Sequence, residues 1–252
     1  MSFKDHFSRQ SAAYSRYRPD YPPGLIDWVS SLVPDRRLAV DCATGNGQAA
    51  LSLSSRFDLV VALDGSLEQL GSATPGPNVA YLAALAEHLP IRDHTVSLVT
   101  AAQAAHWFDF GRFHSECRRV LKPGGVVAAW TYGKFRLDDD EGVSQAVDAV
   151  IDDFYENVVG PFWPPERRYV ELGYRTLPFP WREVTAPAFE LETSWDLEGV
   201  LGYLASWSAV QRYRDHHGRD PLQPLRTALE PAWGGAGIRR LRWPVHIRAG
   251  LA

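Results

Sequence analysis

Short runs of apolar, mostly β-branched residues alternate with helix-like stretches through the first half of the chain. Five such runs predict buried strands, at residues 38–43, 58–64, 78–83, 95–100 and 125–131. Helical patterns follow several of them, at residues 48–55, 66–72 and 110–121. Continuous apolar strands separated by helices are typical of a parallel sheet covered on both faces. The pattern therefore predicts an α/β, doubly wound fold.

The alternation stops after residue 131. The later sequence predicts helices at about 141–155, 197–214 and 224–230, a proline-rich loop at 160–165, and strands at 185–193 and 243–248. These two strands bring the expected sheet to seven, mostly parallel. Ligands of doubly wound sheets bind at the carboxyl ends of the strands. We therefore expect this aromatic-rich insertion to cover that edge as the far wall of a substrate pocket, or alternatively to be a packing layer.

Composition narrows the class of protein. The chain has 252 residues and a net charge of −4, which offers no broad attraction to phosphate backbones or anionic lipid. The charged N-terminus does not resemble a signal peptide, and no apolar run approaches the length of a membrane span. Two cysteines make a disulfide framework improbable. We expect a soluble cytoplasmic protein with no nucleic-acid or membrane partner and no obligate protein partner.

The segment 41–47, Asp-Cys-Ala-Thr-Gly-Asn-Gly, joins the first predicted strand to a helix. Gly45 and Gly47 let a ligand approach the backbone N–H groups closely. With Ala50 they also match a dinucleotide fingerprint. Asp41 favours the other candidate, S-adenosylmethionine, because a carboxylate repels a diphosphate and attracts an ammonium and a sulfonium. Asp64 ends the second strand, where its carboxylate is expected to accept from the ribose hydroxyls of either ligand.

The same loop resembles the Asp/Glu-x-Gly-x-Gly-x-Gly motif of class I S-adenosylmethionine-dependent methyltransferases, with Ala43 in place of the first glycine. Residues 86–90 and 121–125 resemble the segments that follow the third strand and precede the fifth strand in that family. Further segments resemble the branch containing trans-aconitate methyltransferase-like proteins: residues 7–8, 14–22, 106–109, 162–165 and 207–212. The resemblance covers nearly the whole chain and implies a Rossmann-like methyltransferase type 11 domain.

The resemblance implies a site for S-adenosylmethionine, with S-adenosylhomocysteine as product. Arg18 is expected to hold the methionyl carboxylate, and Gln103 to reach the sulfonium through its amide oxygen. Glu87 or the backbone near Ala86 is expected to contact adenine, because Leu85 stands where many relatives have an acid. The methyl group of Ala43 is expected only to narrow the loop. The full expected set is Tyr14, Arg18, Asp41, Ala43, Gly45, Gly47, Asp64, Gly65, Ala86, Glu87, Ala101 and Gln103.

His106 follows the fourth predicted strand, beside the expected methyl group. It is the candidate general base for a phenol, alcohol or amine acceptor, and the alternative is a hydrogen-bonded core group. The candidate acceptor-binding residues are Tyr17, Trp107, Trp163, Trp207 and Arg212. His216 and His217 are adjacent on a predicted helix and face different directions, so no metal site is expected.

These features predict methyl transfer from S-adenosylmethionine to a small-molecule acceptor, with catalysis mainly from positioning. A carboxylate acceptor, which the resemblance suggests, is already ionised at neutral pH and needs no base. A nicotinamide-dependent oxidoreductase and a non-catalytic cofactor-binding protein of the same fold remain alternatives. The expected organisation is one domain over residues 1–252, with a lid at 1–35, a cofactor-binding core at 36–135, a substrate-side insertion at 136–240 and a closing strand at 241–252.

Overall fold

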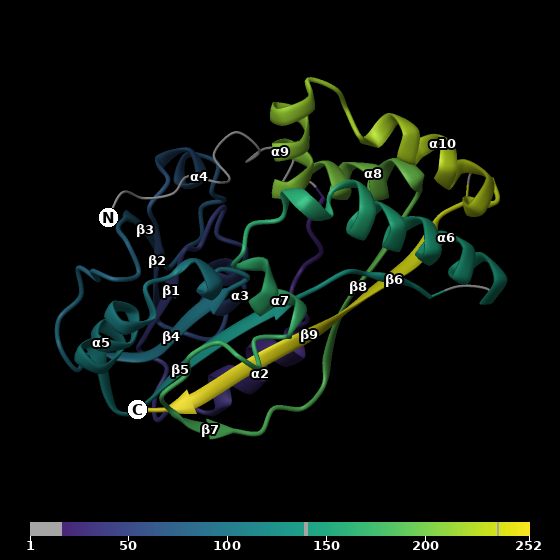
Figure 1. Ribbon diagram of the computed structural model, residues 1–252. Helices are drawn as coiled ribbons and strands as arrows, with labels where there is room; N and C mark the ends of the chain where they lie inside the picture. Colours follow the sequence, from purple (N-terminus) through teal and green to yellow (C-terminus); the bar gives the residue numbers. More distant parts are fainter. Residues whose placement is uncertain (1–16, 139–140, 236) are drawn as a thin grey trace.

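The described residues, 17–138, 141–235 and 237–252, form one nine-stranded sheet in the computed structural model. The strand order is β3-β2-β1-β4-β5-β9-β6, and β7 and β8 also pair with β9 (Figure 1). Five strands are parallel: β1 (Leu38–Cys42), β2 (Leu59–Asp64), β3 (Val79–Ala83), β4 (Val96–Ala102) and β5 (Leu121–Tyr132). The long β9 (Arg239–Leu251) runs antiparallel to β5, and β6 (Arg136–Leu137), β7 (Arg182–Val184) and β8 (Phe189–Trp195) pair antiparallel with β9. The α/β, mostly parallel prediction is confirmed, with two short strands, β6 and β7, in addition to the seven expected.

Helices cover both faces of the parallel strands because successive residues of a strand face opposite sides. Ala39 of β1 packs in one core cluster with α2 (Pro23–Ser31) and α3 (Gln48–Ser54), whereas the next residue, Val40, packs with α5 (Phe110–Val120). The short α4 (Leu67–Gly71) follows β2. Leu25 and Val29 of α2 are fully buried. Residues 23–31 are therefore part of the core, and the expectation that the whole of 1–35 forms a lid is wrong for this helix.

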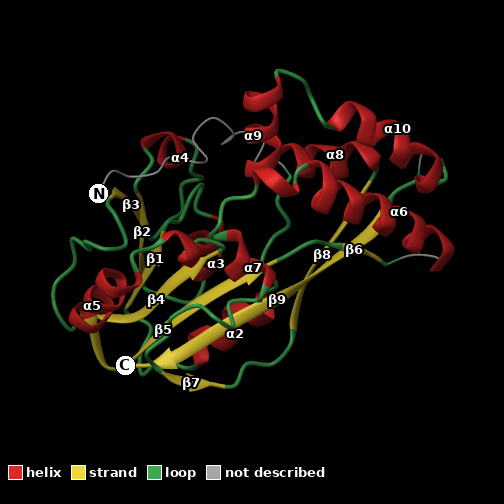
Figure 2. Ribbon diagram, viewed as in Figure 1, coloured by secondary structure: helices red, strands yellow, loops and turns green. Residues whose placement is uncertain are grey.

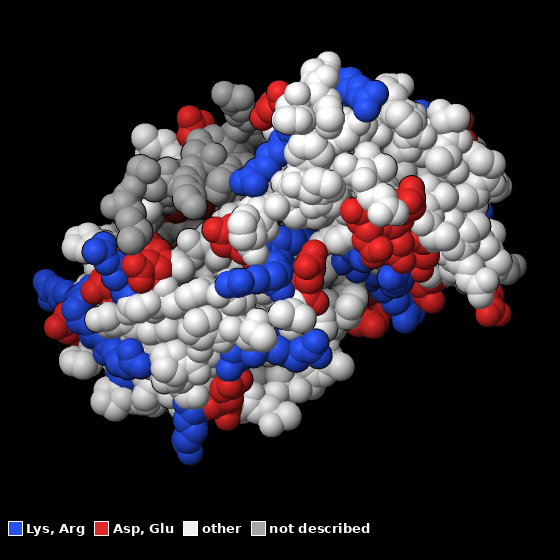
Figure 3. All heavy atoms as spheres, in the orientation of Figure 1, with Lys and Arg blue, Asp and Glu red and all other residues white. Residues whose placement is uncertain are grey.

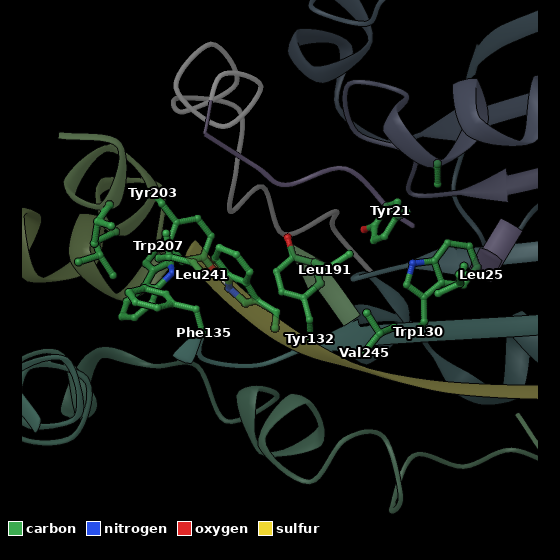
Figure 4. Close-up of a cluster of buried hydrophobic side chains, with 14 of the residues drawn as sticks. Tyr21, Leu25, Trp130, Tyr132, Phe135, Leu191, Tyr203, Trp207, Leu241 and Val245 are labelled. Carbon is green, nitrogen blue, oxygen red and sulfur yellow. Dashed lines mark hydrogen bonds between the residues drawn. The ribbon is translucent and has the colours of Figure 1, made fainter. Parts of the chain in front are cut away.

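Four helices gather at the end of the sheet where β5 finishes: α6 (Glu141–Asp153), α8 (Leu197–Ala205), α9 (Ser208–His217) and α10 (Leu222–Trp233), which we call the cap (Figures 1 and 2). The short α7 (Arg167–Glu171) contacts the 3₁₀ turn at Ala105–Trp107 instead. Aromatic side chains join the cap to the sheet. Tyr203 and Trp207 lie beside Phe135 at one end of the cluster in Figure 4, and Trp130 lies beside Leu25 at the other.

The single helix expected over 197–214 is two helices. Trp207 has extended backbone angles, φ −73° and ψ 133°, so the chain leaves the helix between α8 and α9. Trp207 is only 4% exposed and packs edge-to-face on Tyr155, with ring centroids 5.6 Å apart. The helix breaks where this indole is buried. Helical periodicity in the sequence cannot indicate the break, because the burial depends on residues that are remote in sequence.

Several strand boundaries also differ from expectation, and β9 spans Arg239–Leu251 where the sequence predicts a strand at 243–248. The turn expected at 121–125 lies inside β5 as a bulge, with Leu121 opposite Val96 and Val126 opposite Leu98. The strand expected at 185–193 begins only at Phe189, because residues 185–188 include Pro187, which has no N–H to donate to a ladder.

The surface shown in Figure 3 carries Lys and Arg beside Asp and Glu, in small groups of both signs. Such a face offers no extended field of one sign to a charged polymer. Within the described residues, no helix combines the length and apolar character needed to cross a membrane.

Candidate active site

The loop after β1 takes a backbone path that only small residues follow easily. Ala43, Gly45 and Gly47 have positive φ angles of 52°, 59° and 88°. A Cβ on Gly47 would lie 2.1 Å from the hydroxyl of Tyr81 and would displace that side chain, so the contact and the positive φ together favour glycine there. Ala43, at the position of the family's first glycine, adopts a left-handed conformation that is costly for an L-residue. The expectation that its methyl group only narrows the loop is therefore wrong, because the cost lies in the backbone.

Asp41 lies beneath this loop with its side chain fully buried. Its Oδ2 accepts from Thr44 Oγ1 at 2.5 Å and its Oδ1 accepts from Thr100 Oγ1 at 2.7 Å. Burial raises the pKa of Asp41 to about 6, opposed by the two hydroxyl hydrogen bonds. Because Asp41 is fully buried under the loop, it can act on a cation above the loop through its charge, and the expected attraction for an ammonium stays a prediction.

Asp64, at the end of β2, fixes the loop from the other side. Its Oδ2 accepts from the backbone N–H of Gly45 and its Oδ1 from that of Ser66, both at 2.8 Å, with Gly65 between the strand and the turn. The carboxylate thus has a set orientation at the carboxyl end of the sheet. Residues 41–47 and 64–69 contain three acids and no Lys or Arg. These negative charges suit a cationic amino-acid nucleoside and not a diphosphate.

The segment expected to contact adenine makes a hydrogen bond to the start of α5. Glu87 Oε1 accepts from the backbone N–H of Asp109, the N-cap residue of α5, at 2.8 Å. Ala86 is buried and Leu85 is 40% exposed. One oxygen of Glu87 therefore positions α5, and its expected contact with adenine remains a prediction. Ala101, in β4, is fully buried in a core cluster with Tyr174.

A pocket opens between the carboxyl ends of β4 and β5 and the cap. Its empty space, including the open mouth, is about 510 Å³. It unites six residues that the sequence singles out: Arg18, Gln103, His106, Trp107, Trp163 and Trp207. It adds five that the sequence analysis misses: Gly133, Pro164, Arg167, Tyr203 and Ser208. The residues of the insertion that line this pocket support the interpretation that the insertion forms its far wall.

Two of the expected acceptor-binding residues lie elsewhere. Tyr17 packs its ring on α8, where a Cβ on Gly202 would lie 2.6 Å from it. Arg212 is on α9 and does not line this pocket. Tyr14 falls outside the described residues.

Gln103 is bound to β5 by all of its side-chain polar atoms. Its Oε1 accepts from Thr131 Oγ1 at 2.6 Å and from the Tyr132 N–H at 2.9 Å, and its Nε2 donates to the Tyr132 carbonyl at 3.0 Å. An amide oxygen has two lone pairs. Both are used, so the expectation that this oxygen faces a sulfonium is wrong, and Gln103 serves to hold β4 against β5 at the pocket floor.

His106 is 7% exposed, with Nδ1 2.8 Å from the hydroxyl of Tyr174. Burial lowers the pKa of His106 to about 3, and the positive charge of Arg167 lowers it further. The imidazole is therefore neutral at physiological pH and a weak proton acceptor. Of the two roles left open by the sequence, the hydrogen-bonded group fits and the general base does not.

Two guanidinium groups give the pocket its positive charge. Arg18 Nη1 donates to Tyr132 Oη at 2.8 Å, and its guanidinium lies 5.1 Å from the centre of the Tyr203 ring. Arg167 lies 4.4 Å from the centre of the Trp163 ring. Its Nε donates to Tyr155 Oη at 2.9 Å. No carboxylate of the described chain lies within 4.0 Å of the Arg167 guanidinium.

This geometry can be compared with known proteins. A methyltransferase domain family matches residues 40–129. A solved structure from Anaeromyxobacter dehalogenans, described as a type II methyltransferase, is 45% identical with a TM-score of 0.84, over 93% of this chain and 98% of that one. A Dictyostelium discoideum protein named as a methyltransferase is 28% identical over 250 residues, which are 97% of this chain and 94% of that protein.

A methyltransferase of uncharacterised function from Mycobacterium tuberculosis is 39% identical over 133 residues, about half of each chain. A structure from Anabaena variabilis shares the fold, with a TM-score of 0.52 at 16% identity. The chain therefore belongs to the S-adenosylmethionine-dependent methyltransferases of the class I fold. The nicotinamide-dependent oxidoreductase is accordingly set aside. The relationship to the trans-aconitate methyltransferase branch stays a prediction.

Proposed function

We propose that this protein transfers a methyl group from S-adenosylmethionine to a carboxylate of a small organic acid. The observation that carries the proposal is the pocket itself, which combines the guanidinium groups of Arg18 and Arg167 with a neutral, weakly basic His106. Guanidinium groups bind carboxylates strongly. A phenol, alcohol or amine acceptor would instead need a base, and the pocket's single imidazole is unsuited to that task.

The loop after β1 and the end of β2 fit the cofactor. Gly45 and Gly47 leave the loop without side chains that would cover its backbone, and Asp64 is oriented by two backbone N–H groups. We assign the nucleoside to Asp64 and Gly65, and the cationic amino-acid end to the loop above Asp41. When bound, the cofactor supplies an electrophilic methyl group on a sulfonium.

The protein's contribution is to bind and orient the acceptor. A carboxylate has a pKa near 4 and is already ionised at neutral pH, so no proton has to be removed. Arg167, held on Trp163, compensates the acceptor's charge, and Trp107, Trp163 and Trp207 provide aromatic walls. Holding the nucleophilic oxygen about 3–3.5 Å from the methyl carbon is worth several kcal/mol of the barrier.

The test is methyl transfer from S-adenosylmethionine labelled in its methyl group, offered with organic acids, phenols and amines. A carboxyl methyl ester releases labelled methanol in mild alkali, whereas methyl ethers and methylamines do not. We expect alkali-labile label with acids, retained in His106→Gln and lost in Asp64→Ala. Label that is found only on phenols or amines, or that resists alkali, would show that the acceptor class is wrong.

A further inference from the structure

His106 and Tyr174 form a buried pair at the pocket wall. Tyr174 is fully buried, and its hydroxyl lies 2.8 Å from His106 Nδ1. The chain brings the phenol there through two successive left-handed residues, Gly173 with φ 57° and Tyr174 with φ 59°. A positive φ is costly for a tyrosine, and such strain is retained where the surroundings fix one position for a side chain.

The direction of this hydrogen bond follows from counting donors. If Nδ1–H donated to the phenol oxygen, the hydroxyl hydrogen of Tyr174 would need another acceptor. Among the side chains of the described residues, His106 Nδ1 is the one partner of that hydroxyl with full hydrogen-bond geometry. Thr131 also interacts with the phenol, but its own hydroxyl is held by donation to Gln103 Oε1 at 2.6 Å. An unsatisfied buried donor is costly. The hydroxyl of Tyr174 therefore donates to Nδ1.

The backbone agrees with this assignment. Burial raises the pKa of the Tyr174 phenol, and the backbone N–H of His106, directed at the phenol oxygen, opposes the rise. The phenol oxygen thus has a backbone donor of its own and does not need Nδ1–H as a donor, which is consistent with donation from the hydroxyl to Nδ1.

The remaining nitrogen, Nε2, faces the pocket. The His106 side chain makes no other hydrogen bond within the described chain, and its Nε2 is not among the buried side-chain atoms that lack a partner. Nε2 is therefore accessible, and His106 lines the pocket with Arg18 and Arg167. In a neutral imidazole whose Nδ1 accepts, the proton sits on Nε2.

We propose that Tyr174 is a positioning residue that fixes His106 as the Nε2–H tautomer, so that His106 donates a hydrogen bond to an oxygen of the acceptor. The acceptor part of this inference rests on the proposed function, and the tautomer does not. An N–H at this position favours groups with lone pairs, such as carboxylates. It disfavours ammonium groups, which present only hydrogens.

The tautomer can be read directly from the protein without any acceptor. Ring ¹⁵N spectra of protein labelled in its eight histidines, with His106 assigned from the signals lost in His106→Gln, distinguish the two neutral forms. We expect the Nε2–H pattern for His106, unchanged between pH 8 and pH 5, and a shift towards the Nδ1–H form in Tyr174→Phe. Tyr203→Phe removes another pocket hydroxyl and should leave the pattern unchanged. An Nδ1–H pattern in the wild type, or an unaltered pattern in folded Tyr174→Phe, overturns the proposal.

Kinetic measurements on His106 variants provide a second test, which does not require the Tyr174→Phe variant to fold. The amide N–H of glutamine reaches the place of Nε2, whereas that of asparagine reaches only the place of Nδ1. We therefore expect the KM for an organic-acid acceptor to change little in His106→Gln and to rise roughly tenfold in His106→Asn. Equal KM values in the two variants would contradict the donor role. If acids prove not to be acceptors while the Nε2–H pattern is found, the proposed function fails and the tautomer assignment stands.

Discussion

Replacement of Asp41 by asparagine tests the electrostatics of the loop after β1. The carboxylate is fully buried and bonded to two hydroxyls, and burial raises its pKa from 3.8 to about 6. The substituted amide side chain would be neutral at every pH. The comparison of wild type with Asp41→Asn therefore isolates the free-energy cost of ionising this one group inside the protein.

The magnitude and sign follow from linkage. A difference of about two pKa units corresponds to roughly 3 kcal/mol, at 1.36 kcal/mol per unit. Because the folded pKa is the higher one, the folded protein binds the proton more tightly, and this stability is present at low pH. It is lost as the pH rises from about 4 through 6. Relative to Asp41→Asn, the wild type should thus lose up to about 3 kcal/mol between pH 4 and pH 7.

Urea denaturation of both proteins at pH 4, 5, 6, 7 and 8 measures the difference in unfolding free energy. The changed hydrogen bonds to Thr44 and Thr100 add an offset that does not vary with pH, so only the slope matters. Asp35→Asn is the control. The hydrogen bond from Lys122 holds the pKa of Asp35 at about 2, so its difference from wild type should stay flat over this range. A flat line for Asp41→Asn, or a slope of the opposite sign, would refute the assigned pKa and its cause.

Three other substitutions test the site and its loop. Asp64→Ala should weaken binding of S-adenosylmethionine by about 1–3 kcal/mol through lost charge-assisted hydrogen bonds; an unchanged Kd in titration calorimetry would place the ribose elsewhere. Arg167→Gln should raise the KM for an acid acceptor roughly tenfold or more while the cofactor Kd is unchanged, and Arg167→Lys should recover part of the loss. A normal KM in Arg167→Gln would show that this guanidinium does not bind the acceptor. Ala43→Gly should stabilise the protein by about 0.5–1 kcal/mol in thermal unfolding, because relief of the left-handed strain, about 1–2 kcal/mol, exceeds the added backbone entropy of glycine, about 0.5–1 kcal/mol. Gly218→Ala, at φ 64° with no neighbour within 4 Å, should show a loss of similar size, and a fall in stability for Ala43→Gly would contradict the strain.

The parallel half of the fold follows from the sequence because its signals are local. Each strand from β1 to β4 is a continuous apolar run bounded by turn residues, and the observed bounds differ from the expected ones by at most two residues. The expected burial is wrong for β3, which lies at the edge of the sheet and is half-buried to exposed. The break between α8 and α9 could not be predicted in this way, since Trp207 leaves the helix to pack against Tyr155, more than fifty residues earlier in the chain.

The two halves of the candidate site differ for the same reason. The loop after β1 and Asp64 are identified by a contiguous motif and its spacing, and the structure joins them through the hydrogen bond from Gly45 to Asp64. Even there, the positive φ of Ala43 and the burial of Asp41 beneath Thr44 are properties of the folded backbone that residue type alone does not specify.

The acceptor half is assembled from five separated parts of the chain: the segment before α2, the end of β4, the residue Gly133 after β5, the start of α7 with the loop before it, and the junction of α8 with α9. Arg167 has no motif around it, and its importance appears only once Trp163 supports it and no acid of the described chain neutralises it. Tyr174 is likewise defined by its hydrogen bond to His106, sixty-eight residues away. Because the cofactor loop belongs to the sheet and most acceptor contacts belong to the insertion after β5, changes in the insertion can alter the acceptor without disturbing the cofactor. Arg167→Gln and His106→Asn should therefore change the acceptor KM and leave cofactor affinity intact, whereas Asp64→Ala should do the reverse.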